Sequence, residues 1–394
     1  MFSSFLALLS PALAAPTELQ PRQSINAYTA PRLVNYVQTF RYGNGNRVSL
    51  APLVDQGTGI THVNLAALHI NDDPNGITLN DNSPDDAYYD QTWQEVQTLQ
   101  SQGVKVLFML GGAAKGSYLK LCSNATPGTK ADQDYYNALV DTIRAHNIDG
   151  VDLDIEESVD VSCALALLQH LHASFGPDFL LTMAPVASAM WPSGPGLSGF
   201  DYPTLDAAAT EPTRPNGKLV NWYNAQFYNG WGDASAQDFY NAIITMGNWK
   251  PERVVMGVLD NSADGGSGFV ALETLKGVIK QLQANYPAFG CAVGWEYWNA
   301  GATDGYASPW QWVKEIGNVV FQATALPTRN LTVASDPQPP APFQAETNAL
   351  FGLVGNYFEA VRALNITNGD LAEAEKLLGL DDLLGGVLGD VLSE

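Results

Sequence analysis

The sequence predicts an α/β fold, a (β/α)8 TIM barrel with a short helical extension at its C-terminus, and three observations lead to this prediction. Apolar, β-rich runs alternate with segments of helical periodicity, the chain has 394 residues of which 46% are hydrophobic, and no glycine-rich phosphate loop follows the first run. A chain of this length can bury one large core, and alternating strands and helices are typical of a parallel sheet covered by helices. The alternative, an open doubly wound sheet, more often carries a glycine-rich loop after its first strand.

The periodicity assigns each unit of the barrel in turn. The expected strands are residues 32–39, 61–69, 104–110, 150–154, 179–184, 220–228, 253–259 and 290–297. The expected helices are residues 91–102, 131–146, 161–175, 234–246, 272–286 and 310–323. In such a barrel the loops at the carboxyl ends of the strands build the active site.

The barrel is expected to occupy residues 28–330, and the composition changes on both sides of it. Residues 1–14 form an apolar stretch that ends in small residues, which predicts a secretory signal peptide and therefore a secreted protein. Residues 334–343 are a proline-rich linker candidate, and residues 344–394 have helical spacing. We expect this extension to be a helical cap or a partly disordered tail rather than an independent binding module.

The charge of the chain limits its partners. Asp and Glu number 41 against 19 Lys and Arg, so the net charge of −22 repels nucleic acid and anionic membranes. No apolar run approaches the roughly 20 residues that a spanning helix needs. We expect a monomer that binds neither nucleic acid nor membranes, whereas a neutral glycan is compatible with this charge.

Three cysteines and three glycosylation triplets point to covalent modification. Cys122 and Cys163 each lie shortly after a predicted strand, whereas Cys291 lies inside an apolar run, so we expect a Cys122–Cys163 disulfide and a buried thiol at Cys291. No Cys and His spacing resembles a zinc site, and neither a metal nor an organic cofactor is expected. The expected glycosylation sites are Asn124, Asn330 and Asn365.

The most informative stretch is Asp149-Gly-Val-Asp-Leu-Asp-Ile-Glu156 at the end of the fourth predicted strand. Side chains alternate along a strand, so Asp152, Asp154 and Glu156 share one face, and Glu156 reaches the carboxyl end of the barrel. Crowding and burial of carboxyls raise the proton affinity of at least one of them. A carboxyl that keeps its proton near neutral pH suits protonation of a leaving oxygen, as in glycoside hydrolysis.

This stretch matches the pattern D-G-x-D-x-D-x-E and resembles the signature of glycoside hydrolase family 18, the chitinases and endo-β-N-acetylglucosaminidases. The resemblance implies that Glu156 is the acid and base, that Asp154 holds the acetamido group of the substrate, and that Asp152 shares a proton with Asp154. It also implies a retaining, substrate-assisted reaction, in which the acetamido oxygen of the sugar is the nucleophile.

Other stretches resemble the same family and imply further site residues. Gln226-Phe-Tyr-Asn229 implies that Tyr228 binds the acetamido oxygen while Gln226 and Asn229 line the site. The last strand implies Trp295 as the floor of the site, with Trp298 as the alternative, and the fifth implies Met183 as a wall. Where the family often has S-x-G-G, this chain has Met109-Leu-Gly111-Gly112, which keeps the glycine turn and loses the serine hydroxyl.

The resemblance to secreted fungal endo-β-N-acetylglucosaminidases extends from about Pro31 to Trp312. The expected function is hydrolysis of β-1,4 linkages adjacent to N-acetylglucosamine, at the chitobiose core of N-glycans. The alternatives are an endochitinase that uses the same mechanism and a non-catalytic sugar-binding barrel. The presence of both Asp154 and Glu156 favours an enzyme, because binding proteins of this type usually lack one of them.

Overall fold

The fold is given by a computed structural model that describes residues 30–122 and 130–322. The expected signal peptide (1–14), linker (334–343) and helical extension (344–394) lie outside the described residues. The same holds for the glycosylation triplets at Asn124, Asn330 and Asn365.

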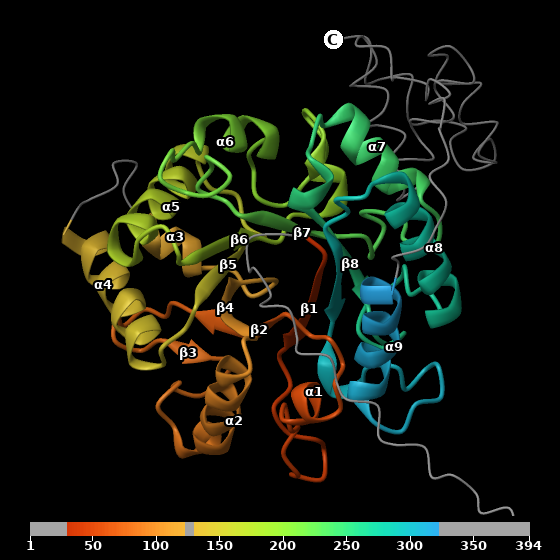
Figure 1. Ribbon diagram of the computed structural model, residues 1–394. Coiled ribbons are helices and arrows are strands. Elements are labelled where there is room, and N and C mark those ends of the chain that lie inside the picture. The colour runs from red at the N-terminus through yellow and green to blue at the C-terminus, as the bar shows by residue number, and fades with distance from the viewer. Residues whose placement is uncertain (1–29, 123–129, 323–394) are drawn as a thin grey trace, which may run out of the picture.

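A closed parallel barrel forms the centre of the molecule, which confirms the predicted fold class (Figure 1). The nine-stranded sheet has the order β1-β9-β8-β7-β6-β5-β4-β2-β3, and the pairing of β1 with β2 closes it. The barrel strands are β1 Arg32–Val37, β2 His62–His69, β4 Lys105–Gly111, β5 Gly150–Asp154, β6 Leu180–Met183, β7 Trp222–Gln226, β8 Val254–Leu259 and β9 Cys291–Trp295. The short β3 (Thr78–Leu79) is antiparallel to β2 and lies outside the ring.

Helices surround the barrel on its outer side (Figure 1). The α-helices are α1 Pro52–Asp55, α2 Asp90–Ser101, α3 Ser117–Leu121, α4 Lys130–Ala145, α5 Val161–Phe175, α6 Tyr202–Ala208, α7 Asp238–Met246, α8 Leu272–Asn285 and α9 Pro309–Gln322. The 3-10 helices are Ala87–Tyr89, Ala187–Met190, Pro251–Arg253 and Tyr297–Asn299. Among the described residues, no helix is both long and apolar enough to cross a membrane.

Alternation along the strands creates two separate apolar regions. One cluster contains only strand residues that face the lumen of the barrel: Val34, Tyr36, Ala66, Ala67, Leu107, Met109, Leu180, Trp222, Val255 and Val293. The larger cluster joins the outward strand residues, such as Leu153, to the apolar faces of the helices. Strands buried on both faces read as continuous apolar runs, which is why the barrel was predictable from the sequence.

The structure joins Cys122, just after α3, to Cys163 in the first turn of α5, as expected. Their Cα atoms lie 5.8 Å apart. Cys291 is a buried free thiol at the start of β9.

Candidate active site

Strand β5 places two aspartates in the lumen of the barrel. Asp152 is 0% and Asp154 is 6% exposed. The register pairs Asp152 with Met109 of β4 and with Thr182 of β6, so these three side chains share the inner face. Glu156 follows two residues beyond Asp154 and is partly exposed at the carboxyl end of the barrel.

Asp152 is held by hydrogen bonds from inside the barrel. The hydroxyl groups of Tyr36 and Thr182 each donate to its carboxylate over 2.5 Å, and the amide of Asn224 donates over 3.0 Å. Burial nevertheless raises the pKa of Asp152, and the three donors oppose this shift. Asp152 therefore acts on the site from beneath, through its proximity to Asp154.

Asp154 and Glu156 share one hydrogen-bond donor. Nε2 of Gln226, at the end of β7, donates to Oδ1 of Asp154 over 3.2 Å and to Oε1 of Glu156 over 3.4 Å. The same nitrogen donates to the carbonyl oxygen of Ala184 over 2.9 Å, which fixes its orientation. The side-chain amide of Gln226 therefore binds the carboxyl groups of both Asp154 and Glu156.

The surroundings favour the protonated form of both carboxyls. Burial raises the pKa of Asp154 well above its ordinary value, and the negative charges of Glu156 and Asp152 raise it further. Burial also raises the pKa of Glu156, while Gln226 and the ammonium of Lys115 oppose this shift. A carboxyl group whose pKa is raised retains a proton that it can donate as a general acid.

A cleft of about 410 Å³ opens directly over these carboxyls. Its lining brings together residues from the ends of several strands, as expected for a barrel. The lining residues are Gln38, Ala67, His69, Met109, Gly111, Gly112, Ala113, Ala114, Asp154, Glu156, Gln226, Tyr228, Asn229, Asp264 and Trp295.

Two aromatic residues of the cleft lie where the sequence pattern indicated. Tyr228 is 8% exposed, and burial beside Asp154 raises its pKa well above the ordinary value, so its hydroxyl keeps its proton and is available as a donor. Trp295 lines the cleft and contacts Tyr36 edge to face at 5.5 Å between ring centroids. Trp298 does not line this cleft and instead lies 6.2 Å from the ring of Tyr42.

The two glycines after β4 are required by the geometry of the cleft wall. Gly111 has a φ of 96°, and a Cβ there would lie 2.4 Å from the carbonyl oxygen of Asp154 and 2.5 Å from the ring of Tyr118. Gly112 has a φ of 85°, and a Cβ there would lie 2.9 Å from the side chain of Met109. Side chains at these positions would strain the backbone and push the wall away from the carboxyls.

The expectation for Met183 is wrong. The pairing of Asp152 with Thr182 turns Thr182 into the lumen, and the next residue therefore points outward. Met183 is 0% exposed and packs in the outer cluster with Leu153, away from the cleft. The methionine that does line the cleft is Met109, where the family often has serine.

Sequence reasoning missed several cleft residues. Gln38 lies two positions beyond the inward-facing Tyr36, and His69 is the last residue of β2, where burial lowers its pKa. The positions of Gln38 and His69 could have been predicted from the rule that inward-facing residues at the carboxyl ends of barrel strands line the site. Asp264 belongs to the loop after β8, and burial raises its pKa; no local pattern singles it out.

A second pocket of about 630 Å³ adjoins the cleft and shares Gln38, His69 and Ala114 with it. Its lining is mostly polar and comes from the loops after β1, β2 and β4. The residues that belong to this pocket alone are Thr39, Phe40, Arg41, Ile70, Asn71, Thr78, Asn80, Asp81, Asn82, Tyr88, Tyr89, Lys115, Ser117 and Lys120. The two hollows together offer room for more than one sugar unit.

Comparisons with known proteins agree with this geometry. The model of the family described as Glycosyl hydrolases family 18 matches residues 32–266. The chain is similar to the solved structure of chitinase ChiC from Aspergillus fumigatus, with 42% identity, coverage of 73% of this chain and 98% of that one, and a TM-score of 0.65. It is also similar to a fungal endo-β-N-acetylglucosaminidase, with 35% identity, coverage of 74% and 99%, and a TM-score of 0.66.

Among the curated proteins, Chitinase 2 of Rhizopus oligosporus is 27% identical over an alignment of 230 residues that covers 52% of this chain and 37% of that protein. The match therefore spans little more than a third of that chitinase. The family match, the barrel and the acidic end of β5 lead to one conclusion: the chain belongs to glycosyl hydrolases family 18.

Proposed function

We propose that this chain is a secreted endo-β-N-acetylglucosaminidase that cleaves the β-1,4 bond within the chitobiose core of N-glycans, with retention of configuration. The observation that carries the proposal is the pair of carboxyls at the base of the cleft, Asp154 and Glu156, joined through the amide of Gln226. Both carboxyls line the cleft, but Glu156 is partly exposed whereas Asp154 is buried, which gives them different tasks.

In the first step the carboxyl of Glu156 donates its proton to the glycosidic oxygen. The acetamido carbonyl oxygen of the substrate attacks the anomeric carbon, the bond to the leaving sugar breaks, and an oxazolinium ion forms. A carboxyl oxygen of Asp154 accepts a hydrogen bond from the acetamido N–H and its partial negative charge stabilises the cation, while the hydroxyl of Tyr228 donates to the acetamido oxygen. The face of Trp295 offers apolar contact to the sugar ring.

In the second step the carboxylate of Glu156 takes a proton from a water molecule. The water oxygen adds to the anomeric carbon and opens the oxazolinium ring, which returns the acetamido group and yields a sugar with retained configuration. Glu156 ends in its protonated form, ready for the next cycle.

The second pocket supports an N-glycan over chitin. A long chitin chain is bound best by a groove lined with aromatic residues, whereas a branched glycan needs a wide and polar space. The polar pocket that adjoins the cleft is larger than the cleft itself, at about 630 Å³ against 410 Å³. Similarity to a chitinase of Aspergillus fumigatus favours the second candidate, an endochitinase with the same mechanism.

A parallel digestion distinguishes the candidates. The full chain is incubated with a high-mannose glycoprotein and with colloidal chitin, and the products are identified by mass spectrometry. We expect released glycans with a single reducing N-acetylglucosamine. Product from chitin alone would reject the N-glycan substrate, and product from neither would favour a non-catalytic sugar-binding barrel.

Two further properties belong to this proposal. Secretion is supported by the apolar N-terminal residues 1–14 and by the Cys122–Cys163 disulfide, which is typical of oxidising compartments. N-terminal sequencing of protein recovered from culture medium should find that residues 1–14 have been removed. We also propose that the enzyme acts as a monomer, which light scattering tests directly.

A further inference from the structure

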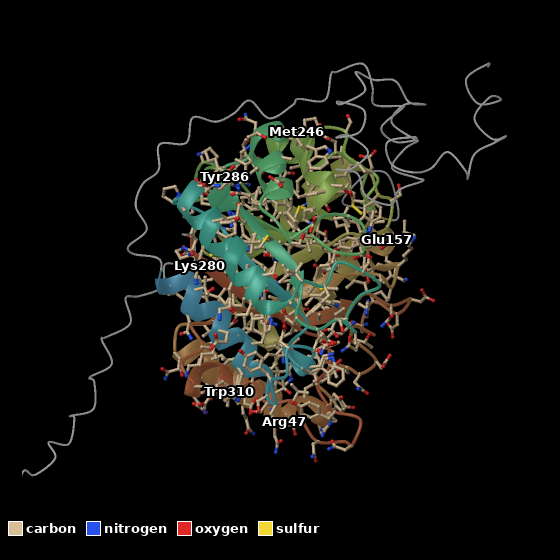
Figure 2. All side chains as sticks on the ribbon, turned by 90° about the vertical axis from the view of Figure 1, so that its right-hand side faces the viewer. Arg47, Glu157, Met246, Lys280, Tyr286 and Trp310 are labelled. Atoms are coloured by element: carbon tan, nitrogen blue, oxygen red, sulfur yellow. A yellow bond between two sulfur atoms is a disulfide. The ribbon has the colours of Figure 1, made fainter. Side chains whose placement is uncertain are left out.

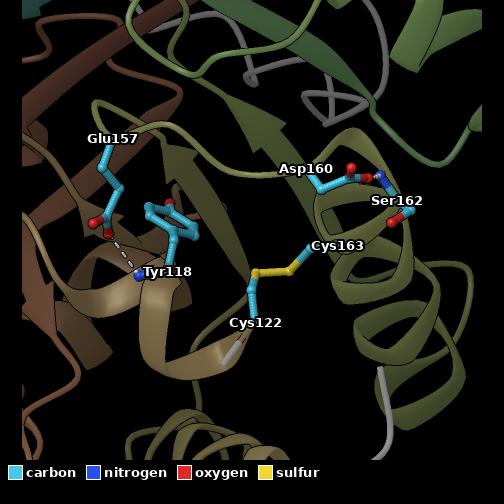
Figure 3. Close-up of a disulfide and its surroundings, with 6 residues drawn as sticks. All are labelled: Tyr118, Cys122, Glu157, Asp160, Ser162 and Cys163. Atoms are coloured by element: carbon cyan, nitrogen blue, oxygen red, sulfur yellow. Dashed lines mark hydrogen bonds between the residues drawn. A yellow bond between two sulfur atoms is a disulfide. The ribbon is translucent and has the colours of Figure 1, made fainter. Parts of the chain in front are cut away.

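A buried acid stands next to the proton donor and faces the other way. Glu157 follows Glu156 directly and is 5% exposed. Its Oε1 accepts a hydrogen bond from the backbone N–H of Tyr118, and its Oε2 accepts one from the backbone N–H of Gly116, both over 2.8 Å. Figure 3 shows the contact between Glu157 and Tyr118 beside the disulfide. No role in the reaction described above uses this carboxylate.

These hydrogen bonds hold the start of α3, which has no cap of its own. Gly116 is the N-cap residue, with a φ of 116°, and no side chain of the helix start accepts from its free N–H groups. Glu157 supplies the missing acceptors from a distant part of the chain. Tyr118 is fastened in addition by its hydroxyl, which donates to the carbonyl oxygen of Leu110 over 2.6 Å.

The loop between Gly112 and Gly116 is thereby tied at both ends to the segment that carries the proton donor. At one end the N–H of Gly112 donates to the carbonyl oxygen of Asp154 over 2.9 Å, and at the other end Gly116 donates to Glu157. Ala113 and Ala114, within this loop, line the cleft. Beyond α3, the Cys122–Cys163 disulfide holds the helix to α5 (Figure 3).

The same loop carries a cation toward the site. Lys115 is exposed and lines the second pocket. Its ammonium opposes the rise in the pKa of Glu156. The other titratable groups around Glu156 are Asp154, Tyr202 and Tyr228, with His69 and Asp264 in the same cleft.

We infer that Glu157 is a positioning residue, whose carboxylate holds the Gly112–Gly116 loop so that its alanines form a wall of the cleft and Lys115 stays at the adjoining pocket. Lys115 then adjusts the proton affinity of the proton donor, and the loop forms one wall of the cleft. The inference rests on the proposed function, because Glu156 must be the acid whose titration limits activity at high pH.

Replacement of Lys115 by Met removes the cation and should move the alkaline limb of kcat/KM to higher pH by about 0.5 unit, as expected for one charge acting near the surface. Added salt should shrink this difference, because exposed charges are screened. Lys280→Met is the matched control: Lys280 is exposed on α8 and lies far from Glu157 (Figure 2). Its profile should equal that of the wild type.

Glu157→Gln keeps one acceptor of two and frees the loop, so its alkaline limb should also move to higher pH. If the Glu157 charge instead acted directly on Glu156, its loss would lower the pKa of Glu156 and move the alkaline limb to lower pH. The direction of the shift therefore distinguishes a freed loop from a lost charge. The double variant with Lys115→Met should shift no further than Lys115→Met alone, since both changes act through one residue. Glu157→Asp keeps the charge and shortens the side chain, and it carries the same test if the Gln variant does not fold.

A lower melting temperature of the Glu157 variants with an unchanged pH profile, or additive shifts in the double variant, would overturn the inference. Failure of the proposed function is recognised separately. If the wild type cleaves neither substrate, titration of isotope-labelled glutamate carboxyls by NMR still reports the pKa of Glu156, and the same shifts are expected there.

Discussion

Removal of the Cys122–Cys163 disulfide by replacing both residues with alanine should destabilise the barrel without altering its chemistry. The disulfide closes a loop of 41 residues, and restricting a loop of that length in the unfolded chain contributes about 4 kcal/mol at room temperature. For a domain of this size that loss lowers the melting temperature by on the order of 8 °C. The Glu157 hydrogen bonds to Gly116 and Tyr118 remain, so kcat of the folded variant should stay within about twofold of the wild type.

Urea unfolding followed by circular dichroism, together with kcat at a temperature below both transitions, measures these two quantities. Cys291→Ala is the matched control, because it removes the buried free thiol and leaves the disulfide in place. Reductant should destabilise the wild type and this control, and it should have no effect on the double alanine variant. An unfolding free energy of the double variant equal to that of the wild type would refute the reasoning from loop entropy.

Three further changes test the site. Glu156→Gln should lower kcat by about 10²–10⁴-fold while oligosaccharide binding by calorimetry stays nearly unchanged, and unaltered turnover would exclude Glu156 as the proton donor. The pKa of Asp154 is raised by burial and by Glu156, so the wild type loses stability as the pH rises above the unfolded value of about 4 and through the folded value. The Asp154→Asn variant has no carboxyl that can ionise at this position. The difference between its melting temperature and that of the wild type should therefore shift in favour of the variant as the pH rises from 4 to 8. A difference that stays constant would contradict the raised pKa of Asp154. Gly111→Ala adds a Cβ at 2.4 Å from a backbone oxygen, whereas at Gly103, with a φ of 83°, a Cβ meets nothing within 4 Å. Gly103→Ala should cost about 1 kcal/mol for backbone strain, and Gly111→Ala about 1–3 kcal/mol more together with a loss of activity; equal costs would reject the close contact.

The barrel strands were predictable because both of their faces are buried. A buried parallel strand is a continuous apolar run, as in β8, which was predicted at residues 253–259 and begins one residue later, at Val254. The short elements were not predicted: β3 has two residues and α3 has five, too few for periodicity to show. The start of α3 depends on a carboxylate that lies far away along the chain, and no local pattern indicates this.

Within the site, the side-chain directions that follow from alternation along one strand were predictable from the sequence. The directions that depend on the register between two strands were not. Asp152, Asp154 and Glu156 share a face because side chains alternate, whatever lies beside the strand. The face to which Met183 points depends on how β6 pairs with β5. Thr182 is the only polar residue of β6, so the sequence of this strand gives little indication of which face is turned inward. A shift of one residue exchanges the two faces, and the expectation for Met183 failed for that reason.

The sequence by itself determined the family, the barrel and the three acids, because each rests on local spacing and on the order of apolar runs. Only the tertiary structure decided which partners those acids have: Gln226 between Asp154 and Glu156, Tyr36 on Asp152, and Glu157 on the loop that carries Lys115. The physical reason is that a strand dictates the direction of its own side chains, whereas hydrogen bonds between distant segments exist only after the barrel has closed.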